Sequence, residues 1–124
     1  MTIAEVLTRI DSIEPNQYSQ SDKLEWLNRL EGQIFDELIL THEHEPDIEF
    51  EPHTETTDEL LVPWPYGGEV YEYYLKAMIA AANHENVKYN TAMALFNAAY
   101  SRYSSTYNRN HVPLPPFPKN RLRF

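Results

Sequence analysis

Residues 65–107 read PYGGEVYEYYLKAMIAAANHENVKYNTAMALFNAAYSRYSSTY, and this segment sets the architecture of the chain. Apolar and tyrosine side chains recur in it every three to four residues, which is the period of an α-helix. Asn83-His84 interrupts the stripe, and we expect a turn at Asn83 because asparagine accepts the left-handed conformation that ends helices. A single bent helix is the alternative, since the stripe keeps its phase across this point. The segment therefore predicts a helical hairpin whose second helix spans 86–107.

Two further helices are expected before this hairpin. Thr2 and Glu5 have the spacing of a capping box, in which the hydroxyl and the carboxylate satisfy free amides at a helix start. Pro15 ends this first helix, and Ser19 or Ser21 can cap the next one. The apolar stripe of the second helix advances in steps of three or four residues and consists of Leu24, Leu27, Leu30, Ile34, Phe35 and Leu38.

The segment 42–62 has a different character. Its prolines, Pro46 and Pro52, forbid a continuous helix. Residues 47–51, DIEFE, alternate polar and apolar side chains, which predicts one short strand, and ELLV at 59–62 predicts a second. Two isolated strands are marginal in water, so we expect them to pair with a neighbouring chain.

The fold class that follows is mainly α: a small bundle of about four helices with a short two-stranded β element and an extended C-terminal tail. A chain of 124 residues is typical of one domain. We place a single helical domain at 1–110, with the acidic loop or β element at 42–62. The four prolines in VPLPPFPKNRLRF exclude a helix near the end of the chain, so 111–124 is expected to be a proline-rich, basic, extended tail.

Composition limits the classes of protein to consider. Apolar residues make up 42% of the chain and charged residues 23%, as in an ordinary soluble globular protein. No apolar run approaches the ~18 residues of a membrane span, and MTIAEVLTRID lacks the apolar region of a signal peptide. The absence of cysteine excludes disulfides, thiolate metal sites and a cysteine nucleophile. Neither of the glycine-rich phosphate-binding motifs, GxGxxG and GxxxxGK(S/T), is present.

Charge is distributed unequally along the chain. Residues 1–62 hold 16 acidic residues against three bases, whereas 63–124 hold three acidic residues and seven bases. An acidic body opposes free binding to nucleic acid. A basic tail on an acidic body suggests that copies attract each other, or that the tail docks on another acidic protein. The alternative is a solvated acidic loop and a solvated basic tail.

Tyrosines are concentrated in the hairpin, where eight of the nine lie between Tyr66 and Tyr107. Tyrosine offers a large apolar face with a polar tip, which suits surfaces that become buried on assembly. The alternative is that these side chains form the edge of the hairpin's own core. The interaction residues we expect are Tyr89, Tyr100, Tyr103, Tyr107 and Arg109, followed in the tail by Phe117, Lys119, Arg121, Leu122, Arg123 and Phe124.

Catalytic and metal-binding patterns are weak. His42, His44 and His53 lie among carboxylates and could hold a divalent metal. Their spacing on a loop is more often that of a solvated segment. No serine lies in a GxSxG motif, and nothing selects a pair of carboxylates for acid–base chemistry. We therefore expect no enzymatic activity, no cofactor and no metal.

Several stretches together resemble a known group of proteins. They are IEPNQYS at 13–19, WLNRLEG at 26–32, ELLVPWPY at 59–66, and the segment from Tyr89 to Arg109. The chain resembles small structural head proteins of tailed phages and prophages of Gram-positive bacteria, and within them the head–tail connector, or adaptor, proteins. The resemblance covers most of 1–109, and its motifs are structural rather than catalytic.

The resemblance implies a helical subunit that assembles as a ring beneath the portal and extends the DNA channel. Its partners would be itself, as a ring-shaped homo-oligomer with a dodecamer expected in the virion, the portal, and a downstream stopper or tail-completion protein. DNA would pass through without specific binding, because acidic walls repel its phosphates. The channel-facing residues would be Glu43, Glu45, Asp47, Glu49 and Glu51.

The corresponding location is the head–tail interface of the virion, and the host cytoplasm during assembly, with no membrane association. A different class of function stays open. The chain would then be a non-enzymatic helical protein-interaction module or regulator with no role in a virion.

Overall fold

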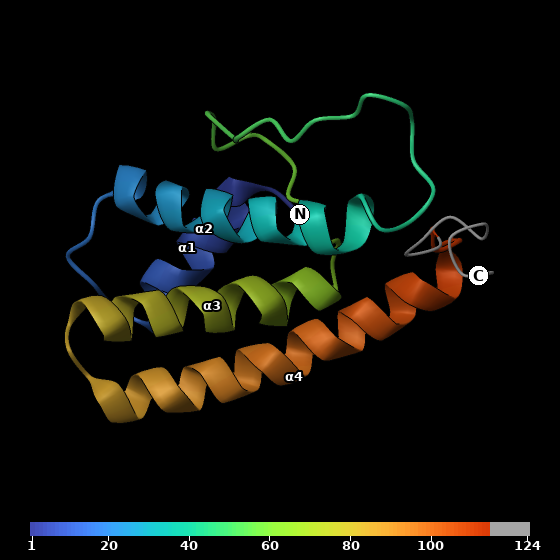
Figure 1. Ribbon diagram of the computed structural model, residues 1–124. Helices are drawn as coiled ribbons and strands as arrows, with labels where there is room; N and C mark the ends of the chain where they lie inside the picture. The colour runs from blue at the N-terminus through green and yellow to red at the C-terminus, as the bar shows by residue number, and fades with distance from the viewer. Residues whose placement is uncertain (115–124) are drawn as a thin grey trace.

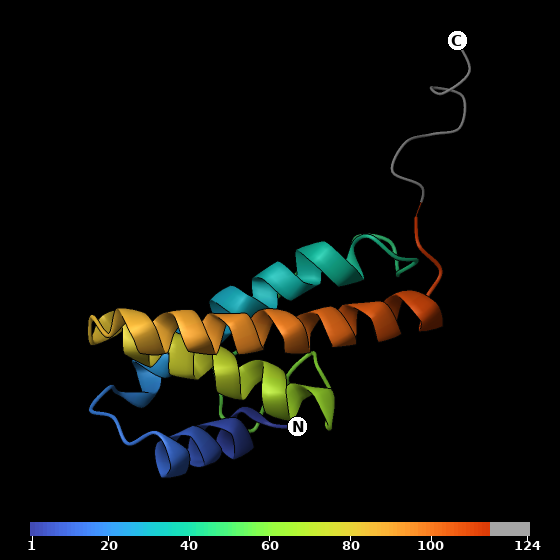
Figure 2. The same cartoon turned by 90° about the horizontal axis from the view of Figure 1, so that it is seen from below.

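The computed structural model describes residues 1–114 and is mainly helical (Figure 1). Its elements, in chain order, are α1 (Ile3–Ile13), α2 (Gln20–Ile34), the π-helical turn η1 (Phe35–Ile39), α3 (Tyr66–Ala82) and α4 (Asn86–Asn110). α3 and α4 form an antiparallel hairpin, α2 lies along α3, and α1 packs against α3 and α2 on the side away from η1 (Figure 2). The predicted bundle of four helices is confirmed.

The turn of the hairpin lies where the sequence placed it, but a different residue takes the left-handed conformation. α3 ends at Ala82, and Asn83 has a φ of −87°. It is His84 that has a φ of 58°. Asn83 stays in the last turn because its amide donates to the Ile79 carbonyl. The two helices are therefore separate, and α4 extends to Asn110, beyond the predicted end at 107.

The N-terminal helix begins where its capping pattern predicts, but only the hydroxyl half of the capping box forms. The Thr2 hydroxyl oxygen accepts from the Glu5 amide at 3.3 Å, and the same hydroxyl donates to the Glu5 carboxylate. One side of α1 then lies in the core against α3. The buried apolar positions of α1 are Ile3, Val6, Leu7 and Ile10, as the spacing indicated.

The second helix begins at the Ser19 cap, where the serine hydroxyl oxygen accepts from the Asp22 amide at 3.1 Å. It does not continue as a regular α-helix to Leu38. At Phe35 it widens into the π-helical turn, in which the Leu40 amide donates to the Phe35 carbonyl at 3.0 Å. This turn keeps both Phe35 and Leu38 buried.

Gly32 lies inside α2 and faces the aromatic ring of Phe50. A Cβ atom added at Gly32 would lie 3.7 Å from that ring, which is ordinary van der Waals contact. Glycine in a helix interior costs about 1 kcal/mol relative to alanine. We therefore expect Gly32→Ala to raise the free energy of unfolding by about 1 kcal/mol, measured by urea denaturation. An unchanged or lowered value would contradict the helical environment described for this position.

The predicted two-stranded β element is wrong for the described chain. Within residues 1–114 there are only two isolated β-bridges, between Thr2 and Glu59 and between His42 and Pro113. The stretch 47–51 does not form a strand, and Asp47 has a φ of 59°, which interrupts an extended run. Of its two apolar residues, Phe50 packs on Gly32 and Phe35, whereas Ile48 is exposed.

The long connection between η1 and α3 is held by backbone bonds to the N-terminus. The Ile3 and Ala4 amides donate to the Asp58 and Thr56 carbonyls, and the Leu60 amide donates to the Met1 carbonyl. These bonds hold residues 56–60 against the N-terminus within one chain.

The end of the described chain runs antiparallel to the start of that connection. The Leu114 amide donates to the Thr41 carbonyl, and the Glu43 amide donates to the Val112 carbonyl, both at 2.8 Å. The rest of the predicted tail, 115–124, lies outside the described residues. Among residues 1–114, no helix has both the length and the apolar character needed to cross a membrane.

Candidate functional site

The tyrosines of α4 pack largely inside the subunit. Tyr103 is 7% exposed and contacts Tyr66, and the Tyr100 hydroxyl donates to the Glu37 carboxylate at 2.6 Å. Tyr89, Tyr100 and Tyr107 are half-buried. Most of their apolar surface is thus used by the hairpin and by η1, while their part in assembly stays a prediction.

Burial raises the pKa of several of these phenols. For Tyr103, burial and the nearby Tyr107 and Glu31 raise the pKa to about 12, and for Tyr100, burial and the bond to Glu37 raise the pKa further. A phenol with a raised pKa stabilises the fold while it is protonated. That stability is complete below pH 10 and is lost as the pH rises toward 12.

We therefore expect alkaline unfolding between pH 10 and about 12. Circular dichroism should report loss of helix over the same range in which tyrosinate absorbance rises steeply. Tyr103→Phe should move this transition to higher pH, because it removes an ionisable group that must stay neutral in the fold. A transition that does not move would contradict the role of Tyr103.

The three candidate metal-binding histidines have separate partners. His42 is buried, its Nδ1 donates to the Leu38 carbonyl at 2.6 Å, and its ring meets Tyr107 edge to face. His44 donates to the His42 carbonyl, whereas His53 faces Glu31. No group of three His, Cys, Asp or Glu side chains suited to a metal occurs among residues 1–114.

The acidic segment after η1 projects its carboxylates into solvent. All five predicted channel-facing residues are exposed, and within the described part of the chain none of them forms an ion pair. They are Glu43, Glu45, Asp47, Glu49 and Glu51. In Figure 1 the connection that carries them forms the upper edge of the subunit, across α2 from α4.

A basic depression lies on α4. It has a volume of about 380 Å³, and two guanidinium groups and several hydroxyls line it. Arg109 donates to the Thr106 hydroxyl at 3.2 Å, and Arg102 pairs with Glu69 of α3. No acidic residue occurs in α4. The lining residues are Tyr66, Ser101, Arg102, Ser105, Thr106 and Arg109.

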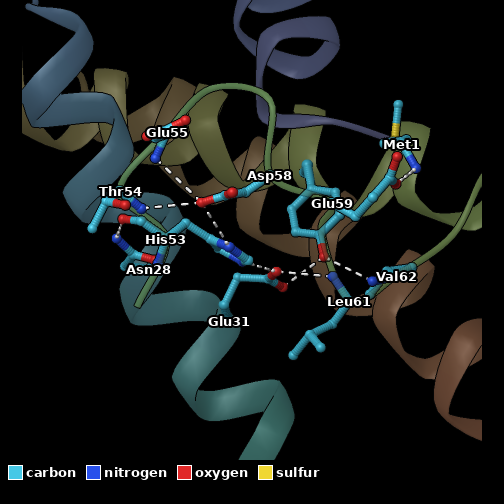
Figure 3. Close-up of polar contacts among 11 residues, drawn as sticks. Met1, Asn28, Glu31, His53, Thr54, Glu55, Asp58, Glu59, Leu61 and Val62 are labelled. Carbon is cyan, nitrogen blue, oxygen red and sulfur yellow. Dashed lines mark hydrogen bonds and ion pairs between the residues drawn. The ribbon is translucent and has the colours of Figure 1, made fainter. Parts of the chain in front are cut away.

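A buried polar cluster surrounds Glu31, and the sequence patterns did not predict it (Figure 3). Glu31 is fully buried in α2. Its Oε1 accepts from the Leu61 amide and from His53 Nε2, both at 2.9 Å, and its Oε2 accepts from the Tyr71 hydroxyl at 2.6 Å. The Tyr71 oxygen in turn accepts from the Val62 amide at 2.9 Å. Each polar group in this chain of bonds therefore has a partner.

The same cluster fixes the connection 53–62 to the helices. Asn28 exchanges two hydrogen bonds with the backbone of His53, at 2.8 and 2.9 Å. Asp58 accepts from the Thr54 and Glu55 amides. Burial and the charge of Glu31 raise the pKa of Tyr71 well above its usual value, which keeps the phenol neutral as a donor. The cluster holds the connection in place and is not open to a ligand, since its central carboxylate has no contact with solvent.

One signal in the sequence could have revealed Glu31. Leu27, Glu31, Ile34 and Leu38 are spaced by three or four residues, so the glutamate is in phase with the apolar stripe. A carboxylate at such a position needs buried donors, and Tyr71 is one of them.

No family model, curated protein or solved structure matches this chain. Function is therefore inferred from the geometry of the described residues and from the sequence stretches 13–19, 26–32, 59–66 and 89–109.

Proposed function

We propose that the protein is a structural subunit of a tailed-phage virion, a head–tail connector whose copies form a ring beneath the portal. One observation supports this most directly. The subunit carries two exposed surfaces of opposite charge on different elements, the acidic segment 43–51 and the basic depression of α4.

Opposite charges on different surfaces favour contact between copies. The acidic segment of one copy can meet Arg102 and Arg109 of the next, and such a head-to-tail contact is heterologous. A heterologous contact repeats around an axis and produces a ring when the rotation closes. Charge complementarity of this kind also excludes wrong partners and speeds encounter.

The acidic surface also suits a channel for DNA. Carboxylates that remain uncovered after assembly would face the lumen and repel the phosphate backbone, so that DNA passes without being held. The helical fold supplies the rigid wall, and the sequence resemblance supplies the location at the head–tail interface.

The position of the gene and an assembly assay test the proposal. The gene should lie beside those for portal and capsid proteins. The full chain, mixed with the neighbouring portal protein, should sediment with it, and micrographs should show an added ring. The chain without portal is expected to associate at micromolar concentration in light scattering.

Charge reversal gives the matched comparison. Arg102→Glu combined with Arg109→Glu should abolish ring formation, whereas Arg29→Glu, on the exposed side of α2, should leave it intact. A gene far from any portal gene, or a chain that stays monomeric with portal present, would contradict the connector function. A monomer that binds a regulatory protein instead would favour the interaction-module alternative.

A further inference from the structure

Trp64 is unusually exposed for so large an aromatic residue. It lies between the connection and α3, and 73% of its surface is accessible. Every other Trp, Tyr or Phe in residues 1–114 is buried or half-buried. Tryptophan in this position is typical of an anchor residue at an interface.

A groove lies beside Trp64, between the N-terminus, α1 and the first turns of α3. Its volume is about 540 Å³, within the range of sites that bind ligands or peptide segments. Met1, Val6, Pro65 and Gly68 contribute the apolar part of its lining. The absence of a side chain at Gly68 leaves open space there.

The groove continues along α1. A second, shallower depression is lined by Ala4, Glu5, Thr8, Arg9 and Ser12, and it shares Glu5 and Arg9 with the first. The two form one track along the surface, the Trp64 groove. Such a track suits an extended segment better than a compact small molecule.

The charged part of the lining of the Trp64 groove is mainly acidic. Three carboxylates, those of Glu5, Glu69 and Glu72, line it against the single guanidinium of Arg9. Arg9 pairs with Glu72 at 3.2 Å, and Glu69 pairs with Arg102. Glu5 contacts the Thr2 hydroxyl and has no ion pair within residues 1–114, which leaves a carboxylate open to a cation.

We propose that the Trp64 groove binds the C-terminal segment 115–124 of a second copy of this chain. That segment reads PPFPKNRLRF, with three prolines, two phenylalanines and three bases but no acidic residue. Proline-rich segments dock on grooves lined by exposed aromatic side chains. The prolines and Phe117 match Trp64, and Lys119 and Arg121 match the open carboxylate of Glu5.

The position of the chain end favours a second copy over the same one. The described chain ends at Leu114, bonded to Thr41 beside η1. Figure 2 shows this end on the opposite side of the bundle from α1 and the N-terminus. A fully extended segment of ten residues would span at most about 33 Å. A segment from a neighbouring copy could enter the groove without crossing the bundle of the copy that it binds. The inference depends on the proposed function only in requiring that copies associate.

Photo-crosslinking of the full chain tests this. One population carries a photoreactive phenylalanine analogue at position 117, and a second, unmodified population is labelled with heavy nitrogen. Cross-links are expected between the two populations, at residues 1–9 or 64–72 of the labelled copy. Trp64→Ala in the labelled copy should lower their yield about tenfold, as for loss of an interface anchor. Asn97→Ala, on the exposed side of α4, should leave the yield unchanged.

A fluorescence titration gives an independent measurement. Trp26→Phe in the full chain leaves Trp64 as the single tryptophan, and a synthetic peptide of residues 112–124 should shift its emission to shorter wavelength. Cross-links within one copy only, cross-links outside the groove, or a yield indifferent to Trp64→Ala would overturn the proposal. Neither assay contains portal, so a failed portal assay with groove cross-links would refute the connector function alone.

Discussion

Glu31→Ala is expected to lower the free energy of unfolding by about 3–5 kcal/mol, the cost of breaking a buried charged network by removing one member. The substitution leaves the Leu61 amide, the Tyr71 hydroxyl and His53 without their shared acceptor. A domain is stable by only about 5–15 kcal/mol, so the change should be large in urea denaturation.

A double-mutant cycle with Tyr71 separates the network from simple loss of volume. Tyr71→Phe removes the hydroxyl that links Glu31 to the Val62 amide and should cost about 1–3 kcal/mol. The two losses should not add, because the groups share one set of bonds. Glu25→Ala is the control: Glu25 is on the exposed side of the same helix and pairs with Arg29, so its loss should cost below about 1 kcal/mol. Equal costs for Glu25→Ala and Glu31→Ala would refute the buried network.

Gly67→Ala is the second substitution for which we expect a large effect. A Cβ atom at Gly67 would lie 2.5 Å from the Val62 carbonyl oxygen and 2.9 Å from the Met1 sulfur. The methionine side chain can move, but the carbonyl belongs to backbone whose amide is held by Tyr71. The start of α3 must therefore shift, at a cost of about 1–3 kcal/mol, as for other overpacked sites.

The neighbouring glycine supplies the control for this prediction. A Cβ at Gly68 would meet nothing within 4 Å. Gly68→Ala should raise stability by up to about 1 kcal/mol through helix propensity alone. Thermal unfolding should thus show changes of opposite sign at two adjacent positions. A stabilised Gly67→Ala protein would mean that α3 does not approach the Val62 backbone this closely.

The helices could be predicted because their information is local. Thr2 and Ser19 provide caps, and the apolar spacing of each helix is visible within a few turns. The position of the turn between α3 and α4 was equally local. The residue that takes the left-handed conformation could not be predicted locally. The Asn83 amide bonds to Ile79 in the last turn of α3, and it is His84 that has the positive φ.

The connection and the Glu31 cluster could not be predicted by the same reasoning. Alternation in 47–51 is compatible with a strand, but a strand needs a partner. The expected partner lay at 59–62, and the backbone of 56–60 bonds with the N-terminus instead. Glu31 is satisfied by groups that lie 22 to 40 residues away in the chain. Such pairings depend on how helices pack, which local spacing does not specify.

The wide separation of Glu31 from its donors has a consequence for synthesis on the ribosome. The chain emerges N-terminus first, and Tyr71 follows Glu31 by 40 residues. Until α3 has left the exit tunnel, the Glu31 carboxylate lacks its Tyr71 donor, and its Oε2 must stay hydrated. We therefore expect α2 to complete its docking only when the hairpin arrives, because α3 brings the last donor of the Glu31 cluster.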